Sequence, residues 1–213
     1  MDIYYLGQSC FKIKGKNAAV VIDPYDSEFT GLKLPKDLSA DVVLSTHNHQ
    51  DHNFVSAVAG SPLIIVSPGE YEKSRISITG IKTYHDKQQG QERGNNTIYR
   101  INLDGMNLLH LGDLGDILTE EQLSLIDDID ILMIPVGGLS TIDAEDAVKV
   151  VSQIEPKIVI PMHYKTEGLK FELGGIEPFL KEMGAENSIP QPKLSITLDK
   201  LPETTTVVVL NKS

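Results

Sequence analysis

The fold and the chemistry of this chain are indicated most strongly by residues 46–52, which read Thr-His-Asn-His-Gln-Asp-His. Four of these side chains are of the kinds that bind zinc and related divalent ions: His47, His49, Asp51 and His52. The stretch directly follows residues 41–45, whose apolar run predicts a buried strand. Binding groups are often placed on a loop at the end of a rigid element. The motif therefore predicts a metal site at the end of a strand.

A structural role without metal is the alternative for this motif. Residues 46–52 are too polar for a hydrophobic core. Three imidazoles and a carboxylate buried together without metal would each need a hydrogen-bond partner. A metal ion removes that requirement, so the pattern favours metal binding.

Three further residues of ligand type each stand just past a strand-like run: His85, Asp113 and His163. The runs are residues 76–84, 108–112 and 158–162. Each residue alone is equally consistent with an ordinary surface position. Their shared placement favours a common site.

The order His-x-His-x-Asp-His, then His, then Gly-Asp, then Pro-Met-His resembles the metallo-β-lactamase superfamily. Residues 20–24 (Val-Val-Ile-Asp-Pro) are similar to its first motif, a strand that ends in Asp. Residues 5–11 and 84–86 are similar to the small Zn-dependent hydrolase branch that includes ascorbate-6-phosphate lactonase. The resemblance extends over about residues 3–165.

This resemblance implies a site with two metal ions. The ligands form two sets and a bridge: His47, His49 and His85; Asp51, His52 and His163; and Asp113 between them. Seven ligands are too many for one tetrahedral ion. Two ions can activate a shared water and stabilise the charge that develops as it attacks. We expect zinc, with iron or manganese as alternatives.

Two residues are expected to support the ligands without binding metal. Asp23 resembles the structural Asp of the first motif and would orient the ligand loop through hydrogen bonds. His110 lies inside an apolar run, and we expect it to pack or to hold the turn at Asp113 by a hydrogen bond.

Three residues are expected to act on the substrate or on water. Asp51 could orient the nucleophile or pass a proton, in addition to binding metal. Tyr164 and Lys165 directly follow His163, and we predict that they contact an anionic or carbonyl substrate. A packing Tyr and a salt-bridged Lys are the alternative for this pair.

Departures from the family pattern narrow the choice of subfamily. Asp113 stands where the best-known zinc β-lactamases are expected to carry Cys, which argues against antibiotic hydrolysis. His49 stands where the oxygen-reducing di-iron relatives are expected to carry Glu. Gln8 stands where many members of the small hydrolase branch are expected to carry His.

We therefore expect a metal-dependent hydrolase acting on an ester, lactone, amide or phosphodiester bond of a small molecule. A metal-binding module without turnover, such as a sensor or regulatory protein, is the first alternative. A nuclease is the second, and the formal net charge of −11 argues against it, because nucleic-acid binding depends on attraction to phosphates.

Composition agrees with one compact enzyme. The 213 residues fit a single domain over residues 1–213, and 40% of them are hydrophobic. No apolar stretch approaches the ~18 residues of a membrane span, and no signal segment is evident. A single Cys cannot form an internal disulfide. We expect a cytoplasmic protein with no membrane or nucleic-acid partner; its oligomeric state is left open.

The resemblance implies an α/β fold, an αββα sandwich of two mixed β-sheets flanked by helices. Hydrophobic patterns predict strands at residues 3–6, 10–13, 18–22, 41–45, 63–66, 76–84, 97–103, 106–111, 129–135, 157–160, 194–198 and 205–210. Helices are predicted at residues 52–59, 119–126, 143–154 and 176–183. Residues 88–96 should form a loop that shapes the mouth of the site, or else a solvated loop.

Overall fold

Two mixed β-sheets form the centre of the molecule. The computed structural model describes all 213 residues. The first sheet has the strand order β12-β1-β2-β3-β4-β5. Its strands are β1 (Asp2–Gly7), β2 (Cys10–Lys14), β3 (Ala19–Ile22), β4 (Val42–Leu44), β5 (Leu63–Ile65) and β12 (Leu194–Ser195). Strands β3, β4 and β5 are parallel, and the other pairs are antiparallel.

The second sheet has seven strands in the order β13-β11-β10-β9-β8-β7-β6. They are β6 (Gly69–Lys73), β7 (Ile76–Tyr84), β8 (Asn95–Leu103), β9 (Met106–His110), β10 (Ile131–Pro135), β11 (Ile158–Met162) and β13 (Thr206–Val207). Strands β6 to β9 are antiparallel neighbours, whereas β9, β10, β11 and β13 run parallel.

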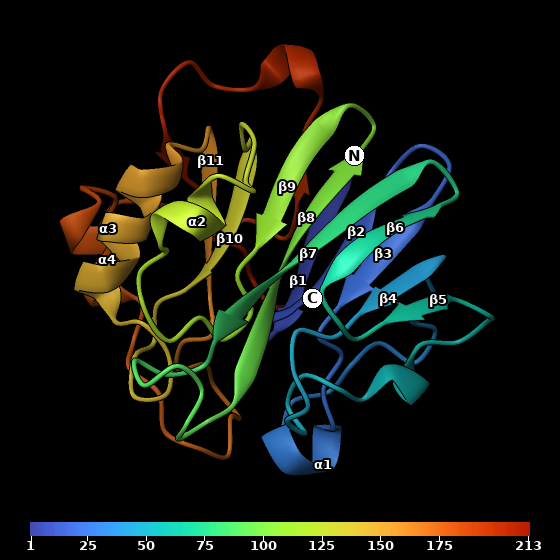
Figure 1. Cartoon of the computed structure of the whole chain (residues 1–213), viewed down its shortest axis with the longest axis horizontal. Helices are drawn as coiled ribbons and strands as arrows, with labels where there is room; N and C mark the ends of the chain where they lie inside the picture. The colour runs from blue at the N-terminus through green and yellow to red at the C-terminus, as the bar shows by residue number, and fades with distance from the viewer.

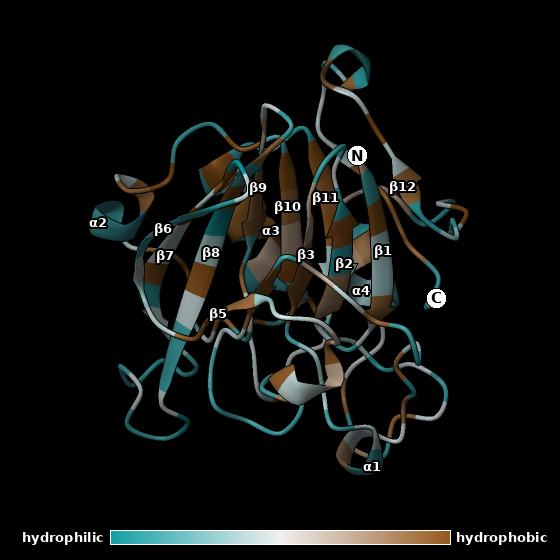
Figure 2. Cartoon of the chain, turned by 90° about the vertical axis from the view of Figure 1, so that its right-hand side faces the viewer, coloured by the Kyte–Doolittle hydropathy of each residue, from teal (hydrophilic) through white to brown (hydrophobic).

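The main core lies between the two sheets. Its 45 buried residues come from both sheets and from the helices that cover the second one. Every residue of β10 and β11 is buried, as expected for parallel strands covered on both faces. Figure 2 shows both strands largely in the brown of hydrophobic residues.

Helices cover the two sheets unequally. The α-helices are α1 (Ser27–Thr30), α2 (Glu120–Leu123), α3 (Ala144–Ile154) and α4 (Glu177–Glu182). Figure 1 shows α2, α3 and α4 on the side of β9, β10 and β11. The first sheet has only α1 and loops on its outer face, with a second core of 10 buried residues beneath them. The longest helix, α3, has 11 residues, and no helix combines the length and apolar character needed to cross a membrane.

The sandwich of two mixed sheets confirms the predicted fold class. Two predicted helix starts also match: a capping box joins Thr119 and Gln122 at the start of α2, and Asp143 caps α3. The helix predicted over residues 119–126 ends early, at Leu123, and the one predicted over residues 176–183 spans Glu177–Glu182.

The helix predicted over residues 52–59 was wrong, because only a 3-10 turn, η1 (Val55–Ala57), forms there. Phe54 N donates to Pro24 O at 2.7 Å, and Ala59 N donates to Leu38 O at 2.8 Å. These tertiary hydrogen bonds hold both ends of the segment in a path that a regular helix cannot follow.

The strand pattern differs from the prediction mainly at the sheet edges. The runs at residues 194–198 and 205–210 contribute only the two-residue strands β12 and β13, and a 3-10 turn, η2 (Leu198–Lys200), follows β12. Strand β6 was not predicted. Its charged sequence Gly-Glu-Tyr-Glu-Lys suits an exposed edge strand, and it lacks the apolar alternation that marks buried strands.

Strand direction brings the predicted ligands to one end of the sandwich. Because β7 and β9 are both antiparallel to β8, they run the same way, and β10 and β11 are parallel to β9. His85, Asp113 and His163 therefore follow strand ends at the same edge of the second sheet. The carboxyl ends of parallel strands are a common place for ligand sites.

Close backbone approaches join the turns at this edge. Gly115 N donates to Tyr84 O at 2.9 Å, and a Cβ at Gly115 would collide with the backbone of His85 and Asp86. Gly137 meets the His163 carbonyl in the same way. Only glycine allows these turns to lie so close together.

We predict that Gly115→Ala lowers the free energy of unfolding by about 1–3 kcal/mol, because the backbone of His85 and Asp86 must move. For a chain of this size the melting temperature should fall by about 2–12 °C. Gly175→Ala is the matched control, since its Cβ would meet only the flexible Glu177 side chain. Equal melting temperatures for the two variants would contradict the close packing at Gly115.

Candidate metal centre

The loop of residues 46–52, which follows β4 and is called the ligand loop, is held at both ends by Asp23. Asp23 Oδ1 accepts a hydrogen bond from Thr46 N at 2.8 Å. Its Oδ2 accepts from Thr46 Oγ1 at 2.8 Å and from His52 Nδ1 at 2.9 Å. Asp23 is fully buried and stands directly after β3, which pairs with β4. These contacts are the ones expected of a residue that orients the ligand loop.

The same hydrogen bonds fix two imidazole tautomers. The Thr46 hydroxyl donates to Asp23, so it accepts from His47 Nδ1–H at 3.0 Å. His52 Nδ1–H donates to Asp23. The Nε2 atoms of His47 and His52 are therefore left to face the centre, as in ligand histidines whose other nitrogen is bonded by a neighbour.

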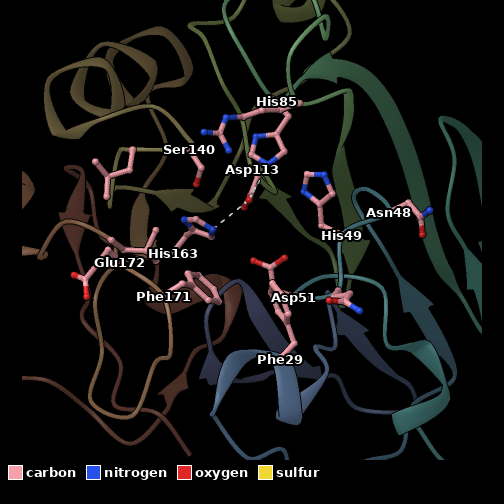
Figure 3. Close-up of a pocket in the computed structure, with 14 residues that line it drawn as sticks. Phe29, Asn48, His49, Asp51, His85, Asp113, Ser140, His163, Phe171 and Glu172 are labelled. Atoms are coloured by element: carbon pink, nitrogen blue, oxygen red, sulfur yellow. Dashed lines mark ion pairs between the residues drawn. The ribbon is translucent and has the colours of Figure 1, made fainter.

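Imidazoles from three parts of the chain surround the carboxylate of Asp113. Asp113 Oδ2 lies 3.2 Å from His85 Nε2, 3.2 Å from His163 Nε2 and 3.9 Å from His47 Nε2. Asp113 Oδ1 lies 3.2 Å from His52 Nε2. Figure 3 shows His85, Asp113 and His163 pointing into one shared space.

All seven predicted ligands converge in this space. Their ligand atoms fall into two groups, each within 4.8 Å: His47, His49 and His85, and Asp51, His52, Asp113 and His163. His47 Nε2 and His49 Nδ1 are 3.0 Å apart. Either group could hold a metal ion.

The environment of these atoms fits a bound cation. His52 Nε2 and Asp113 Oδ1 are buried and have no hydrogen-bond partner, although they face each other at 3.2 Å. Within 4.0 Å, the ionic partners of Asp51 and Asp113 are histidines alone, without lysine or arginine. Buried charges of this kind need a compensating charge, which a divalent ion would supply.

The protonation states of His47, His49 and Asp113 at neutral pH also suit metal binding. Burial lowers the pKa of His47 to about 2 and lowers that of His49, so both imidazoles are neutral. Burial alone would raise the pKa of Asp113, but His163 and His52 bring it well below its usual range. For His52, burial alone would lower the pKa, but the carboxylates of Asp113, Asp51 and Asp23 raise it well above its usual range. A proton and a metal ion would thus compete for His52 Nε2.

Comparison with known families agrees with this geometry. The family described as beta-lactamase superfamily domain matches residues 2–163. The chain belongs to the metallo-β-lactamase superfamily.

Relatives within the superfamily have a consistent description. A metal-dependent hydrolase of Thermoplasma acidophilum is 32% identical over 191 residues, covering 78% of this chain and 84% of the relative. The crystal structure of a protein described as a Zn-dependent hydrolase from Thermotoga maritima is 33% identical, with a TM-score of 0.79, and covers 98% of this chain and 97% of that one. A metallo hydrolase of Ignicoccus hospitalis, 19% identical with a TM-score of 0.66, shares the fold over 92% of this chain and 99% of its own. This protein is thus a metal-dependent hydrolase of the metallo-β-lactamase superfamily.

Two residues hold the turn of this metallo-β-lactamase domain that carries Asp113. Asn96 Oδ1 accepts from Asp113 N at 3.1 Å, and Asn96 Nδ2 donates to Leu111 O at 2.9 Å. His110 Nδ1 accepts from Gly112 N at 3.1 Å, and its Nε2 donates to Ser9 O at 2.8 Å. Both His110 nitrogens are used in this way, and His110 lies outside both ligand groups. No sequence motif predicts a role for Asn96, whose only signal is its position between a predicted loop and a predicted strand.

Gln8 links two members of the second ligand group. Its Nε2 donates to Asp51 Oδ2 at 3.0 Å, and its carbonyl accepts from His163 N at 2.9 Å. The Tyr5 hydroxyl donates to the same carbonyl at 2.9 Å. Gln8 has a φ of 57°, so the turn after β1 directs side chain and carbonyl toward two different ligands. Gln8 stood out in the sequence as a departure from the family pattern, but its contact with Asp51 could be found only in the fold.

The structure places Tyr164 and Lys165 away from the cavity surface. Tyr164 is buried in the core, where its ring stacks on Tyr5 at a centroid distance of 6.2 Å. Lys165 Nζ binds Phe171 O at 3.2 Å and Glu172 Oε1 at 3.1 Å. Neither residue lines the cavity over the centre, and direct substrate contact by them stays a prediction.

A cavity of about 490 Å³ opens over the centre. Five of the predicted ligands line it: His49, Asp51, His85, Asp113 and His163. The other nine lining residues come from α1 and from the loops around its mouth: Phe29, Asn48, Gln50, Arg93, Leu139, Ser140, Phe171, Glu172 and Leu173. Its size suits a small organic molecule. Sequence analysis did not identify most of the wall, because these residues come from loops without a chemical motif.

We predict that Gln8→Ala weakens zinc binding by about 10–100-fold, because Asp51 loses the hydrogen bond that orients it. Competition with a chromophoric chelator would measure the dissociation constant. Gln89→Ala is the control for backbone strain, since Gln89 is exposed and has a similar φ of 55°. Wild-type zinc affinity in Gln8→Ala would show that Asp51 needs no such support.

Proposed function

We propose that this hydrolase holds two divalent ions in the centre and cleaves an ester, lactone, amide or phosphodiester bond of a small molecule. The position of Asp113 Oδ2 carries the proposal. It lies 3.2 Å from His85 of the first ligand group and 3.2 Å from His163 of the second. A carboxylate oxygen between two sets of ligands is placed to bridge two ions.

Bound ions would lower the pKa of a water molecule and stabilise the negative charge that develops on the attacked group. The ligand set of imidazoles and carboxylates suits zinc, iron or manganese. We favour zinc, and we favour the small hydrolase branch that resembles ascorbate-6-phosphate lactonase.

Asp51 is the side chain best placed to handle a proton. One of its oxygens, Oδ2, accepts from Gln8, and the carboxylate points into the cavity between His49 and His163 (Figure 3). Burial alone would raise its pKa, but His52 lowers it below the usual range, so Asp51 is ionised at neutral pH. An ionised carboxylate facing the cavity can orient a water molecule and accept its proton.

A small-molecule substrate fits the cavity better than a polymer does. The volume of about 490 Å³ is in the range of small-ligand sites. The formal net charge of −11 disfavours nucleic acid. We therefore propose a small-molecule substrate and no nucleic-acid partner.

The Asp113→Ala variant tests the dinuclear site. We predict that the wild type binds two metal ions per chain, and that this variant binds fewer and loses hydrolysis, because the bridge between the ions is gone. The fold should survive, since the core of 45 buried residues does not depend on metal. Inductively coupled plasma mass spectrometry would count the ions, and circular dichroism would monitor the fold.

Asp37→Ala is the control for the loss of one aspartate, since Asp37 is exposed and makes no side-chain contact in the centre. Asp113→Asn keeps the shape of the side chain if the alanine variant fails to fold. Two ions bound at full occupancy in both Asp113 variants would contradict the bridge.

Hydrolysis itself needs a substrate panel. Protein reconstituted with zinc, iron or manganese should cleave at least one ester, lactone, amide or phosphodiester, and chelation by EDTA should abolish that activity. Binding of two ions without turnover of any member would favour a metal-binding module. Cleavage of RNA or DNA alone would favour a nuclease.

A further inference from the structure

Arg93 is the only lysine or arginine among the residues that line the cavity. It is exposed, and its guanidinium forms no ion pair within the chain. The other charged residue at the rim, Glu172, is already paired with Lys165 at 3.1 Å. Arg93 thus presents an uncompensated positive charge to whatever enters the cavity.

The backbone of Arg93 is fixed by the buried carboxylate of Asp86, which directly follows His85. Asp86 Oδ2 accepts from Arg93 N at 2.7 Å and from Glu92 N at 3.0 Å. Its Oδ1 accepts from Gln88 N and Gly90 N, each at 2.8 Å. The predicted loop over residues 88–96 is therefore tied to one carboxylate through four backbone amides.

The same loop is tied to a predicted ligand as well. His85 N donates to Gly94 O at 3.0 Å. Arg93 thus lies between two anchored points, and its Cα is held at a fixed position relative to His85. A free cation on an anchored backbone beside the reacting centre is suited to recognising a ligand charge.

Phe29 and Phe171 form an aromatic patch of the cavity lining. The rings of Phe29 and Phe171 lie 5.7 Å apart, and Figure 3 shows both across the centre from His85. Phe29 is 44% exposed and Leu139 is 74% exposed, although both border the cavity. Leu139 has a φ of 61°, a conformation that is costly for a branched side chain and that often marks a functional site. Exposed apolar groups around an open cavity indicate contact with an apolar part of a ligand.

We propose that the substrate is amphipathic. Its anionic group, a carboxylate or phosphate, binds the guanidinium of Arg93. Its apolar group lies against Phe29, Phe171 and Leu139, and the bond to be cleaved lies between the two groups at the centre. This assignment rests on the proposed function, because it places the cleaved bond at the metal ions.

Binding of non-hydrolysable probes tests the assignment without turnover. We would titrate the zinc-loaded protein with 4-phenylbutyrate, its neutral amide 4-phenylbutyramide, and 3-phenylpropylphosphonate by isothermal calorimetry. Both anions should bind more tightly than the amide, and the stronger of the two indicates whether a carboxylate or a phosphate is preferred. Arg93→Gln should weaken the preferred anion by about tenfold and leave the amide unchanged, because one charge-assisted contact is lost. Phe171→Ala should weaken all three probes.

Arg75→Gln is the charge-matched control, since Arg75 is exposed in the turn between β6 and β7 and lies outside the cavity lining. Anion affinity that is unchanged in Arg93→Gln would show that the metal ions hold the anion, and would overturn the assignment. No preference for anions over the amide, or no binding of any probe, would overturn it as well. Arg93-dependent binding without turnover of any substrate would contradict the proposed function and leave the anion site standing.

Discussion

The carboxylate of Asp113 is buried among imidazoles from three other parts of the chain, within 3.2 Å of His52, His85 and His163. A negative charge so far from water is tolerated only next to positive charge. Neither lysine nor arginine reaches it, so protonated histidine or metal must compensate it. The compensating groups come from both sheets, because residues 47–52 follow β4 of the first sheet, whereas His85 and His163 follow β7 and β11 of the second.

Hydrogen bonds from residues outside the ligand set hold the ligand side chains and their loops in position. Asp23 ties the two ends of the ligand loop together, Asn96 and His110 hold the Asp113 turn, and Gln8 joins Asp51 to His163. Each of these residues binds backbone or ligand atoms from a different strand or loop. Catalytic metal sites depend on such partners to fix the tautomer and direction of their ligands. Asp86 has a similar part at the cavity wall, where its carboxylate accepts a hydrogen bond from the backbone of Arg93.

The sequence could predict the parts of this structure that follow from local patterns. The spacing within residues 46–52 predicted a metal-binding loop. Apolar runs predicted that His85, Asp113 and His163 each follow a strand, and the resemblance to a known family predicted the sandwich. The prediction of a helix over residues 52–59 was wrong, because tertiary hydrogen bonds to Pro24 and Leu38 override the local helix propensity. The cavity wall could not be predicted, because Phe29, Leu139 and Phe171 share no sequence motif and only the fold brings them together.

We propose that two metal ions share Asp113. A crystal structure of the zinc-loaded protein, with anomalous data collected on both sides of the zinc absorption edge, tests it most directly. We predict two anomalous peaks about 3.5–4 Å apart, with the Asp113 carboxylate between them. Either one of its oxygens binds both ions, or each oxygen binds one ion. The first ion should contact His47, His49 and His85, and the second Asp51, His52 and His163. A single peak under saturating zinc, or two peaks without Asp113 between them, would contradict the account.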